Sequence, residues 1–556
     1  MKIAGRNVHW SLITLGTIVG IFLLLQLAIF AFLQPLVGQV IRTSVSFFSD
    51  DLYQVDFKKL RVQLFRKAIH LEEVSLTYDT VRVQASAHLR RSKHYTGTVQ
   101  DVTINLHEFT YFLSGRYMAI DRISVNQPAV YAHRFPEATP ADSSSSDTTA
   151  LDFNTFRLIK PYFDSIAVAQ LTVQGASVGV VQHRPSAAPD TTQVKHVSVL
   201  VESAHIDSVA ASRTHGWPRM QTCILSLRDQ TFTSADSLYR YHVDSVRVNP
   251  LRGTLLVKRF AILPQWDRYE MGEHVGQLVN WRQLDVAQVK ATDIDFTALT
   301  DSLMIRAHRV SVEEADFTLF RDLRLPSGEP TFRPLLQGML RSVPVPFWID
   351  TIMLEKSTIR YEERRASTNQ AGYITFDDTY ASLYHVTNRP ADSAATLSAD
   401  VRTQLMGAGE AVLHFTFPLT SALSEHQITG TLDRMPLDAL NPTAEPLAFV
   451  SVKSGMNNRM DFDMQLNEKY ATGSVRFQYE NLKLSLLKEG GAKNKKEIKS
   501  WLANALVVKD SNPVRTKPLR PGPIQFERDT TRSMFNYWWR ALRSGLEVSV
   551  GVESPS

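Results

Sequence analysis

Apolar and polar residues alternate along much of the chain after residue 44. In residues 411–417 and 460–466 every second position is apolar, and most positions between them are polar. Successive side chains of a β-strand point to opposite faces, so this period of two predicts strands with one apolar and one solvated face. Residues 81–89 have the same period and are predicted to form another such strand. Helical periodicity is largely absent up to residue 487, except around residues 106–114.

Two segments near the C-terminus have a helical pattern instead. Residues 494–506 and 532–546 each place their apolar side chains on one helical stripe, and arginines stand at positions 532, 540 and 543. Amphipathic helices rich in aromatic residues and arginine suit a membrane interface. A helix that covers the last edge of a sheet needs the same stripe, and the pattern leaves both alternatives open. The candidate interfacial residues are Phe535, Trp538, Trp539 and Leu542.

The N-terminal region carries a membrane-anchor pattern. Residues 10–41 contain no Asp, Glu, Lys or Arg. This uncharged segment is long enough for a transmembrane helix, which needs about 20 apolar residues. Lys2 and Arg6 precede the segment, so the positive-inside rule places the N-terminus in the cytoplasm and the bulk of the chain outside it. A cleavable signal peptide is the rival interpretation, but its apolar core spans only about 7–15 residues and ends at a small-residue cleavage site. We therefore expect a single-pass anchor.

A long internal repeat organises the chain. The segment that begins at Leu52 (LYQVDFKKLRVQL) returns at Leu238 (LYRYHVDSVRVNP), and residues 164–181 are echoed by residues 348–363. A β unit used twice predicts a mainly β fold built as an elongated, repetitive array. The expected divisions are 1–43 (cytoplasmic tip and anchor), 44–135 (first β unit), 136–150 (polar linker), 151–237 (β segment), 238–325 (second copy of the β unit), 340–487 (C-terminal β region) and 488–556 (amphipathic helices and tail).

Composition excludes several classes of protein. The chain is 44% hydrophobic and 21% charged, which is too apolar for a disordered protein. Its net charge of +5 is spread over 556 residues, so it does not have the concentrated basic character of a nucleic-acid binder. The single cysteine, Cys223, excludes an intrachain disulfide and a cysteine-based zinc site.

Sequence motifs for catalysis or metal binding are present only in fragments. Residues 175–179 match the GxSxG nucleophile elbow around Ser177, but the β pattern continues where a helix should follow. His107 and Glu108 begin an HExxH motif in which Tyr111 replaces the second zinc ligand. Two pairs of aspartates, at 293/295 and 461/463, share a strand face if each lies on a strand, but a solvated face explains them more simply. The sequence therefore predicts no enzyme, cofactor or metal site.

Several segments resemble a known family. They are residues 51–79 (DLYQVDFKKLRVQLFRKAIHLEEVSLTYD), residues 104–134 with the tripeptide Asn126-Gln127-Pro128, residues 350–376, and the motif Leu440-Asn441-Pro442. In these the chain is similar to the AsmA-like family of Gram-negative envelope proteins, the group that includes AsmA, TamB and YhdP, in its bacteroidete branch. The resemblance implies a rolled, groove-like β-sheet between an N-terminal transmembrane helix and C-terminal amphipathic helices.

The resemblance also implies a function. Proteins of this family are implicated in moving phospholipid between the inner and outer membranes through a hydrophobic groove. We expect an inner-membrane protein whose periplasmic bulk binds or conducts phospholipid, with an anchored scaffold for outer-membrane protein assembly or envelope biogenesis as the alternative. The expected partners are phospholipid, the inner membrane, the outer membrane and envelope proteins, but not nucleic acid. The candidate lipid-contacting residues are Val81, Val83, Ala85, Ala87, Leu89, Leu413, Phe415, Phe462 and Met464.

Overall fold

The computed structural model describes most of the chain after residue 32. The described residues are 33–63, 65–86, 89, 94–108, 116–135, 160, 163–183, 190–207, 219–234, 236–302, 304–326, 331–366, 368, 370–389, 395–487, 508–514 and 517–552. Most of the predicted anchor, the polar linker and the predicted helix over residues 494–506 lie outside them, as does most of the helical piece predicted over residues 106–114. Within the described residues, no helix combines the length and the apolar character that a membrane crossing requires.

The structure is mainly β, as predicted: strands account for 60% of it and helices for 16%. The chain folds as two compact units. The first unit contains the described residues up to Gln230 together with residues 247–251. The second contains residues 231–246 and the described residues from Arg252 onward.

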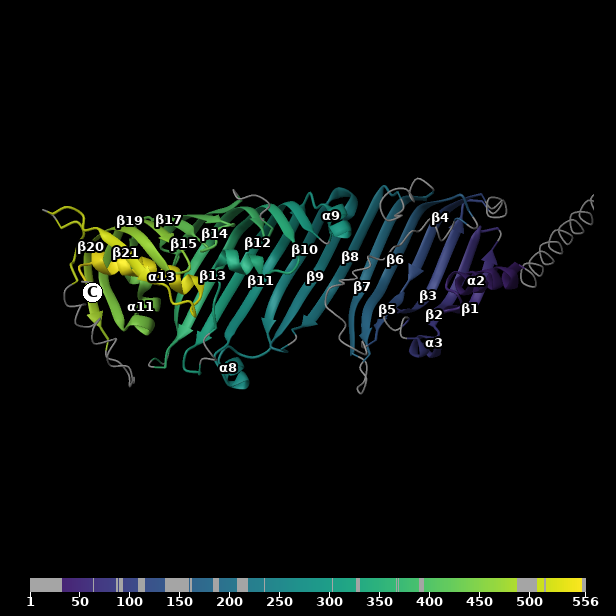
Figure 1. The fold of residues 1–556 in the computed structure, drawn as a ribbon, viewed down its shortest axis with the longest axis horizontal. Coiled ribbons are helices and arrows are strands. Elements are labelled where there is room, and N and C mark those ends of the chain that lie inside the picture. The colour runs from purple at the N-terminus through teal and green to yellow at the C-terminus, as the bar shows by residue number, and fades with distance from the viewer. Residues whose placement is uncertain are drawn as a thin grey trace, which may run out of the picture. The chain divides into compact units, whose positions relative to one another are not determined.

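In the first unit each strand pairs with the next along most of the chain (Figure 1). The pairs are antiparallel, except that β4 and β5 lie one after the other along β3 and both run parallel to β6. The bounds are α2 (Gln34–Phe48), β1 (Tyr53–Gln63), β2 (Ala68–Tyr78), α3 (Thr80–Ala85), β3 (His94–Leu106), β4 (Tyr117–Asn126), β5 (Ala129–Arg134), β6 (Ser165–Gln182), β7 (Asp190–Ile206) and β8 (Thr222–Thr233).

The second unit has the same plan, with β12 and β13 as its parallel pair. Its strands are β9 (Tyr239–Asn249), β10 (Thr254–Pro264), β11 (Asn280–Thr292), β12 (Ile305–Asp322), β13 (Phe347–Arg364), β14 (Gly372–Thr387), β15 (Thr396–Leu405), β16 (Gly409–Pro418), β17 (His426–Leu432), β18 (Met435–Pro436), β19 (Val450–Leu466), β20 (Tyr470–Leu486) and β21 (Gly522–Glu527). Its helices are α8 (Glu270–Val275), α9 (Phe296–Ser302), α10 (Leu336–Arg341), η4 (Leu437–Leu440), α11 (Asn441–Ala448) and α13 (Met534–Ser549), and the short helix η3 (Pro250–Arg252) falls at the division between the units.

The element bounds follow the repeat found in the sequence. β1, β2 and β3 begin 186 residues before β9, β10 and β11 (for β1 and β9, 239 − 53 = 186). β12 occupies the place that β4 and β5 share in the first copy, and each copy ends in a parallel pairing. Within that pairing Ile123 lies beside Leu171 in the first copy, and Val310 lies beside Ile352 in the second.

Left-handed backbone conformations recur at corresponding places in both copies. Glu73 and Arg259, which stand 186 residues apart, have φ of 52° and 45°. Such a residue takes up one extra position, so the apolar alternation shifts by one and continues on the same face: Leu71 and Val74, on either side of Glu73, belong to one core cluster. The other corresponding pairs are Asp51 and Ser237, Lys67 and Gly253, Gln127 and Glu314, Gly175 and Lys356, His196 and Asp378, and Ser203 and His385.

The strand predicted over residues 81–89 is wrong. β2 ends at Tyr78, and Asp79 caps the N-terminus of α3 by accepting a hydrogen bond from the Arg82 N–H at 3.0 Å. Val83 is fully buried while Val81 is 75% exposed, so these two valines do not share a face. Ala85 is exposed and Leu89 half-buried, and Ala87 lies outside the described residues. The capping aspartate starts a helix where the two-residue period predicted a strand, so these residues do not form a lipid-facing strand.

Candidate functional site

Two rows of apolar side chains cross the first unit from strand to strand. Residues that pair directly on neighbouring strands lie on the same face of a sheet, so the pairing registers trace each row from β1 to β8. We call these rows A1 and B1. Row A1 is Val62, Ile69, Ile104, Ile123, Leu171, Val201 and Cys223. Row B1 is Leu60, Leu71, Val102, Val125, Val173, Val199 and Leu225.

The face that carries rows A1 and B1 is only partly covered by described residues. Ile41 of α2 packs against its core cluster, beside β1. Elsewhere many of these side chains remain half-buried. Further along β6, Val178 pairs with Val130 of β5, and the two valines are 50% and 41% exposed. Adjacent exposed valines on neighbouring strands make an apolar surface available to a ligand.

The second unit has two rows of the same kind, A2 and B2, which run from β10 to β21. Neither row contains a charged or polar side chain. Row A2 is Leu255, Ala291, Val310, Ile352, Leu383, Ala399, Phe415, Ile428, Met464, Gly473 and Ile524. Row B2 is Val257, Val289, Val312, Leu354, Ala381, Val401, Leu413, Gly430, Phe462, Val475 and Gly522.

Four of the predicted lipid-contacting residues fall in these rows. β16 and β19 are strands, as predicted, and β17 lies between them. Phe415 and Met464 meet across Ile428 in row A2, while Leu413 and Phe462 meet across Gly430 in row B2. A Cβ on Gly430 would lie 2.5 Å from the Phe462 ring and 2.6 Å from the Leu413 side chain. The glycine therefore makes room for the two large side chains to close over β17.

Rows A2 and B2 differ in cover along their length. Val257, Val289 and Val312 are half-buried, whereas Val475 and Ile524 at the other end are fully buried. The cover at that end is α13, which packs against β20 and β21 (Figure 1). Its close approach uses Gly545, where a Cβ would lie 2.8 Å from the side chains of Val475 and Ile524. The same apolar face is therefore a closed core at its C-terminal end and a partly open surface toward β10.

α13 is held on the sheet by a buried polar contact. The Trp538 indole N–H donates to Nε2 of His426 at 2.9 Å, and Nδ1 of His426 donates to the Ser424 carbonyl at 2.9 Å. The His426 ring also stacks on Phe417. Burial lowers the pKa of His426 to about 4, so the imidazole is neutral at physiological pH and can accept the indole proton. Leu336 and Leu340 of α10 complete the cover around Phe417.

The predicted helix over residues 532–546 is present as α13, and it separates its four candidate residues. Trp538 and Leu542 are half-buried and pack against the core cluster. Phe535 and Trp539 are 70% and 53% exposed. The buried side of α13 thus acts as a cap over the sheet, and a role in a membrane interface remains a prediction for Phe535 and Trp539.

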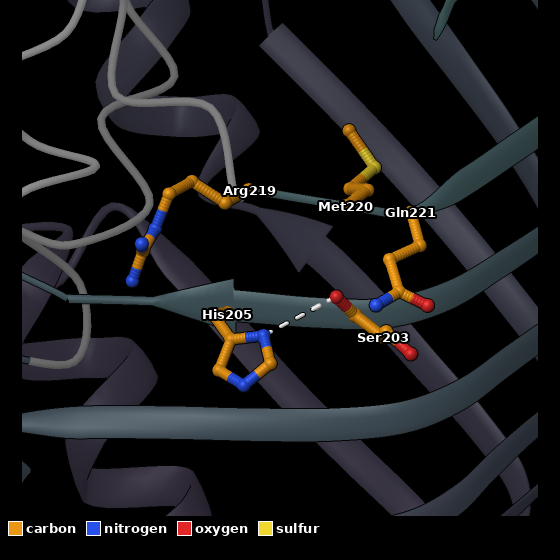
Figure 2. A pocket seen from close by; sticks show the side chains of 5 residues that line it. All are labelled: Ser203, His205, Arg219, Met220 and Gln221. Carbon is orange, nitrogen blue, oxygen red and sulfur yellow. Dashed lines mark hydrogen bonds between the residues drawn. The ribbon is translucent and has the colours of Figure 1, made fainter.

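A small polar pocket lies in the first unit, at one end of β7 and β8. It measures about 190 Å³ and is lined by Ser203, His205, Arg219, Met220 and Gln221 (Figure 2). His205 and Arg219 face each other across an isolated antiparallel bridge, and Nδ1 of His205 donates to the Ser203 carbonyl at 3.2 Å. Met220 packs against the core cluster of the apolar face. His205 pairs with Ala167, which lies between the core residues Ile166 and Val168, so His205 and its bridge partner Arg219 lie on the face opposite rows A1 and B1.

The motif fragments found in the sequence have structural explanations. Ser177 lies inside β6, where its N–H donates to the Pro128 carbonyl, and the strand continues to Gln182. Asp295 is not on a strand but accepts a hydrogen bond from the Ala298 N–H at the start of α9. Asp461 and Asp463 are on β19 and accept hydrogen bonds from Arg459 and Gln427. No group of three or more His, Cys, Asp or Glu side chains in the described part of the chain is arranged to hold a metal ion.

Rows A1 and B1 were missed by the sequence analysis. In β6 the apolar period runs through Leu171 and Val173, shifts by one at Gly175, and resumes at Ala176 and Val178. A period of two applied without interruption breaks at the left-handed residue. A search that allowed a one-residue shift at matching positions of the two copies would have found these rows.

No protein-family model matches the chain, and no curated protein matches it.

Proposed function

We propose that this protein binds phospholipid through the apolar face of its sheet and conducts it between the inner and outer membranes, anchored in the inner membrane with its bulk in the periplasm. The observation that carries the proposal is the set of four unbroken apolar rows, which are half-buried over much of their length. A folded chain gains most from an apolar face when that face is covered. Much of this face lacks a covering helix within the described residues, and acyl chains would supply the missing cover.

The energetics favour acyl chains as the occupant. Each CH₂ group moved from water to an apolar surface contributes about 0.8 kcal/mol. A row that crosses many strands without a polar side chain can contact a long acyl chain along its whole length. The bound acyl chain then buries no polar side chain of the row that would need a hydrogen bond. The adjacent positions of the same strands point to the opposite face and are largely polar, as with Lys290 between Val289 and Ala291.

Site-specific photo-crosslinking tests the proposal. A benzophenone amino acid in place of Val289, a member of row B2, lies on the apolar face. The same probe at the neighbouring Lys290 lies on the opposite face and serves as the matched control. In the full chain, expressed in a Gram-negative host and irradiated in cells, we expect phospholipid adducts at Val289 and none at Lys290. Equal labelling at both positions, or none at Val289, contradicts lipid binding. A protein adduct at Val289 instead of lipid supports the scaffold alternative.

The proposed orientation has its own test. A reporter enzyme that is active only outside the cytoplasm, fused after Ser556, is expected to be active because Lys2 and Arg6 keep the N-terminus in the cytoplasm. An inactive reporter on a stably expressed fusion contradicts the orientation.

A further inference from the structure

The apolar face of the second unit continues past row B2, toward the end of the sheet where β10 is followed by α8 (Figure 1). Val401 of row B2 and Leu405 stand four residues apart on β15, in an unshifted ladder with no left-handed residue between them, so both lie on the same face. Direct pairings carry the position of Leu405 across the neighbouring strands. We call the result row C2. Its members, all half-buried, are Ile262, Leu284, Phe317, Ile359, Phe376 and Leu405.

Small side chains with hydroxyl groups lie between rows B2 and C2. Thr403 stands between Val401 and Leu405, its hydroxyl meets that of Thr379 at 2.8 Å, and Thr379 pairs with Ser357. Each of the three hydroxyls also donates to a backbone carbonyl. An acyl chain that crosses from one row to the other therefore leaves no hydroxyl without a hydrogen bond.

Beyond row C2 the same face becomes polar. Arg321 stands four residues after Phe317 on β12, and it pairs with Glu363 of β13. No left-handed residue intervenes, so Arg321 and Glu363 lie on the apolar face. Tyr361 stands two residues before Glu363 on the same face, and its hydroxyl donates to Oε2 of Glu363 at 2.7 Å. Burial and Glu363 raise the pKa of the Tyr361 hydroxyl, whereas the nearby Arg321 guanidinium opposes the rise. The three side chains thus meet, and we call them the polar end of the face.

The polar end has an unused donor and an excess of positive charge. Nε of Arg321 is buried and has no hydrogen-bond partner among the described residues. Buried donors in folded proteins are almost always paired, so this Nε points to a missing acceptor. Glu363 also forms an ion pair with Arg365 at 3.7 Å, so two arginines share one carboxylate. This balance favours a ligand with a net negative charge.

We propose that the polar end binds the phosphate of a net-negative phospholipid whose acyl chains lie on rows B2 and C2. The inference rests on the proposed function and adds the lipid class and the residue that selects it. The planar guanidinium of Arg321 offers the fork that suits phosphate oxygens. Tyr361 orients Glu363, and the Glu363 carboxylate limits how strongly the phosphate is held.

Photo-crosslinking from row C2 tests the proposal. A benzophenone amino acid in place of Phe317 reports on acyl chains beside the polar end, in the full-length, detergent-purified protein. The probes are the net-negative dioleoylphosphatidylglycerol, the zwitterionic dioleoylphosphatidylethanolamine and dioleoylglycerol, which has the same chains but no phosphate. We expect half-maximal labelling by the net-negative lipid at about ten-fold lower concentration than by dioleoylglycerol, with the zwitterionic lipid between them. Free glycerol phosphate is expected not to compete.

Two variants with opposite expected effects link the labelling to the polar end. Arg321→Gln is expected to raise the half-maximal concentration of the net-negative lipid about ten-fold and to leave that of dioleoylglycerol unchanged. Glu363→Gln removes the opposing charge but can still accept the hydrogen bond from Tyr361, and it is expected to lower that concentration about three-fold. Misfolding does not produce tighter binding, so Glu363→Gln keeps the test valid if Arg321→Gln folds poorly.

Arg309→Gln is the matched control. Arg309 is an exposed arginine of β12, and it directly precedes Val310 of row A2, so it lies on the opposite face of the same strand. Its replacement removes the same charge from the same strand and should leave the labelling by all three lipids unchanged.

The outcomes separate the two proposals. Equal half-maximal concentrations for the net-negative lipid and dioleoylglycerol, or the same response in Arg321→Gln and Arg309→Gln, overturn the phosphate site and leave acyl binding intact. Tighter labelling by the zwitterionic lipid, or no gain in Glu363→Gln, overturns the charge preference. Competition by free glycerol phosphate overturns the lipid as the source of the phosphate. If none of the three lipids labels the probe at position 317, acyl binding by the second unit fails and the phosphate site fails with it.

Discussion

A charge placed at two points of one apolar row distinguishes a closed core from an open surface. Val312 and Val475 both belong to row B2, but Val312 is half-buried and Val475 is fully buried beneath α13. At Val475 an aspartate loses the burial of the valine, about 2 kcal/mol, and either stays charged in an apolar site or takes up a proton with a pKa raised by about 3 units. A shift of that size corresponds to about 4 kcal/mol. We therefore expect Val475→Asp to destabilise the second unit by about 6 kcal/mol.

At Val312 water reaches the new carboxylate, so Val312→Asp is expected to cost only about 1–2 kcal/mol. The assay is urea unfolding followed by tryptophan fluorescence, since Trp538 and Trp539 of α13 report on the second unit. Val312→Thr and Val475→Thr, which keep the branched shape without a charge, are the controls. Equal losses in the two aspartate variants would refute the reasoning, because row B2 would then be closed along its whole length.

The remaining predictions concern the backbone, the helix contact and the packing. Lys356 has a left-handed φ of 48° at the position where the first copy has Gly175, and only glycine adopts this conformation without strain. Lys356→Gly is therefore expected to stabilise the protein by about 1 kcal/mol, and Gly175→Ala to destabilise it by about 1–2 kcal/mol. Both changes are measured as shifts of the urea midpoint. The pKa of His426 is about 4 in the folded protein and near 6.5 in the unfolded chain, so the unfolded chain binds more protons between these values. The free energy of unfolding is therefore expected to fall by up to about 3 kcal/mol as the pH drops from 6.5 to 4. In His426→Gln this contribution to the pH dependence of stability should be absent. Gly430→Ala is expected to cost about 1–3 kcal/mol in thermal unfolding, because its Cβ would collide with Phe462 and Leu413; an unchanged midpoint would show that the two side chains can move apart.

The sequence alone determined the strand content, the repeat and the apolar faces of β16 and β19. These are local properties: a period of two fixes which side chains share a face wherever the backbone stays extended. The alternation of apolar and polar residues was therefore enough to assign Phe415 and Met464 to an apolar face. The helical stripe of α13 was also local information, as its apolar side chains recur at helical spacing.

Only the tertiary structure decided which face is covered and by what. Residues 81–89 have a period of two, but Asp79 caps a helix there. In β6 the left-handed Gly175 shifts the alternation by one residue. The hydrophobic pattern shows neither effect, because a helix cap and a left-handed residue do not depend on hydrophobicity. The covered end of rows A2 and B2 depends on where α13 packs, a contact between segments far apart in the chain. An apolar face has the same sequence whether a helix or a lipid covers it, because burial is a property of neighbours in space and not of neighbours in the chain.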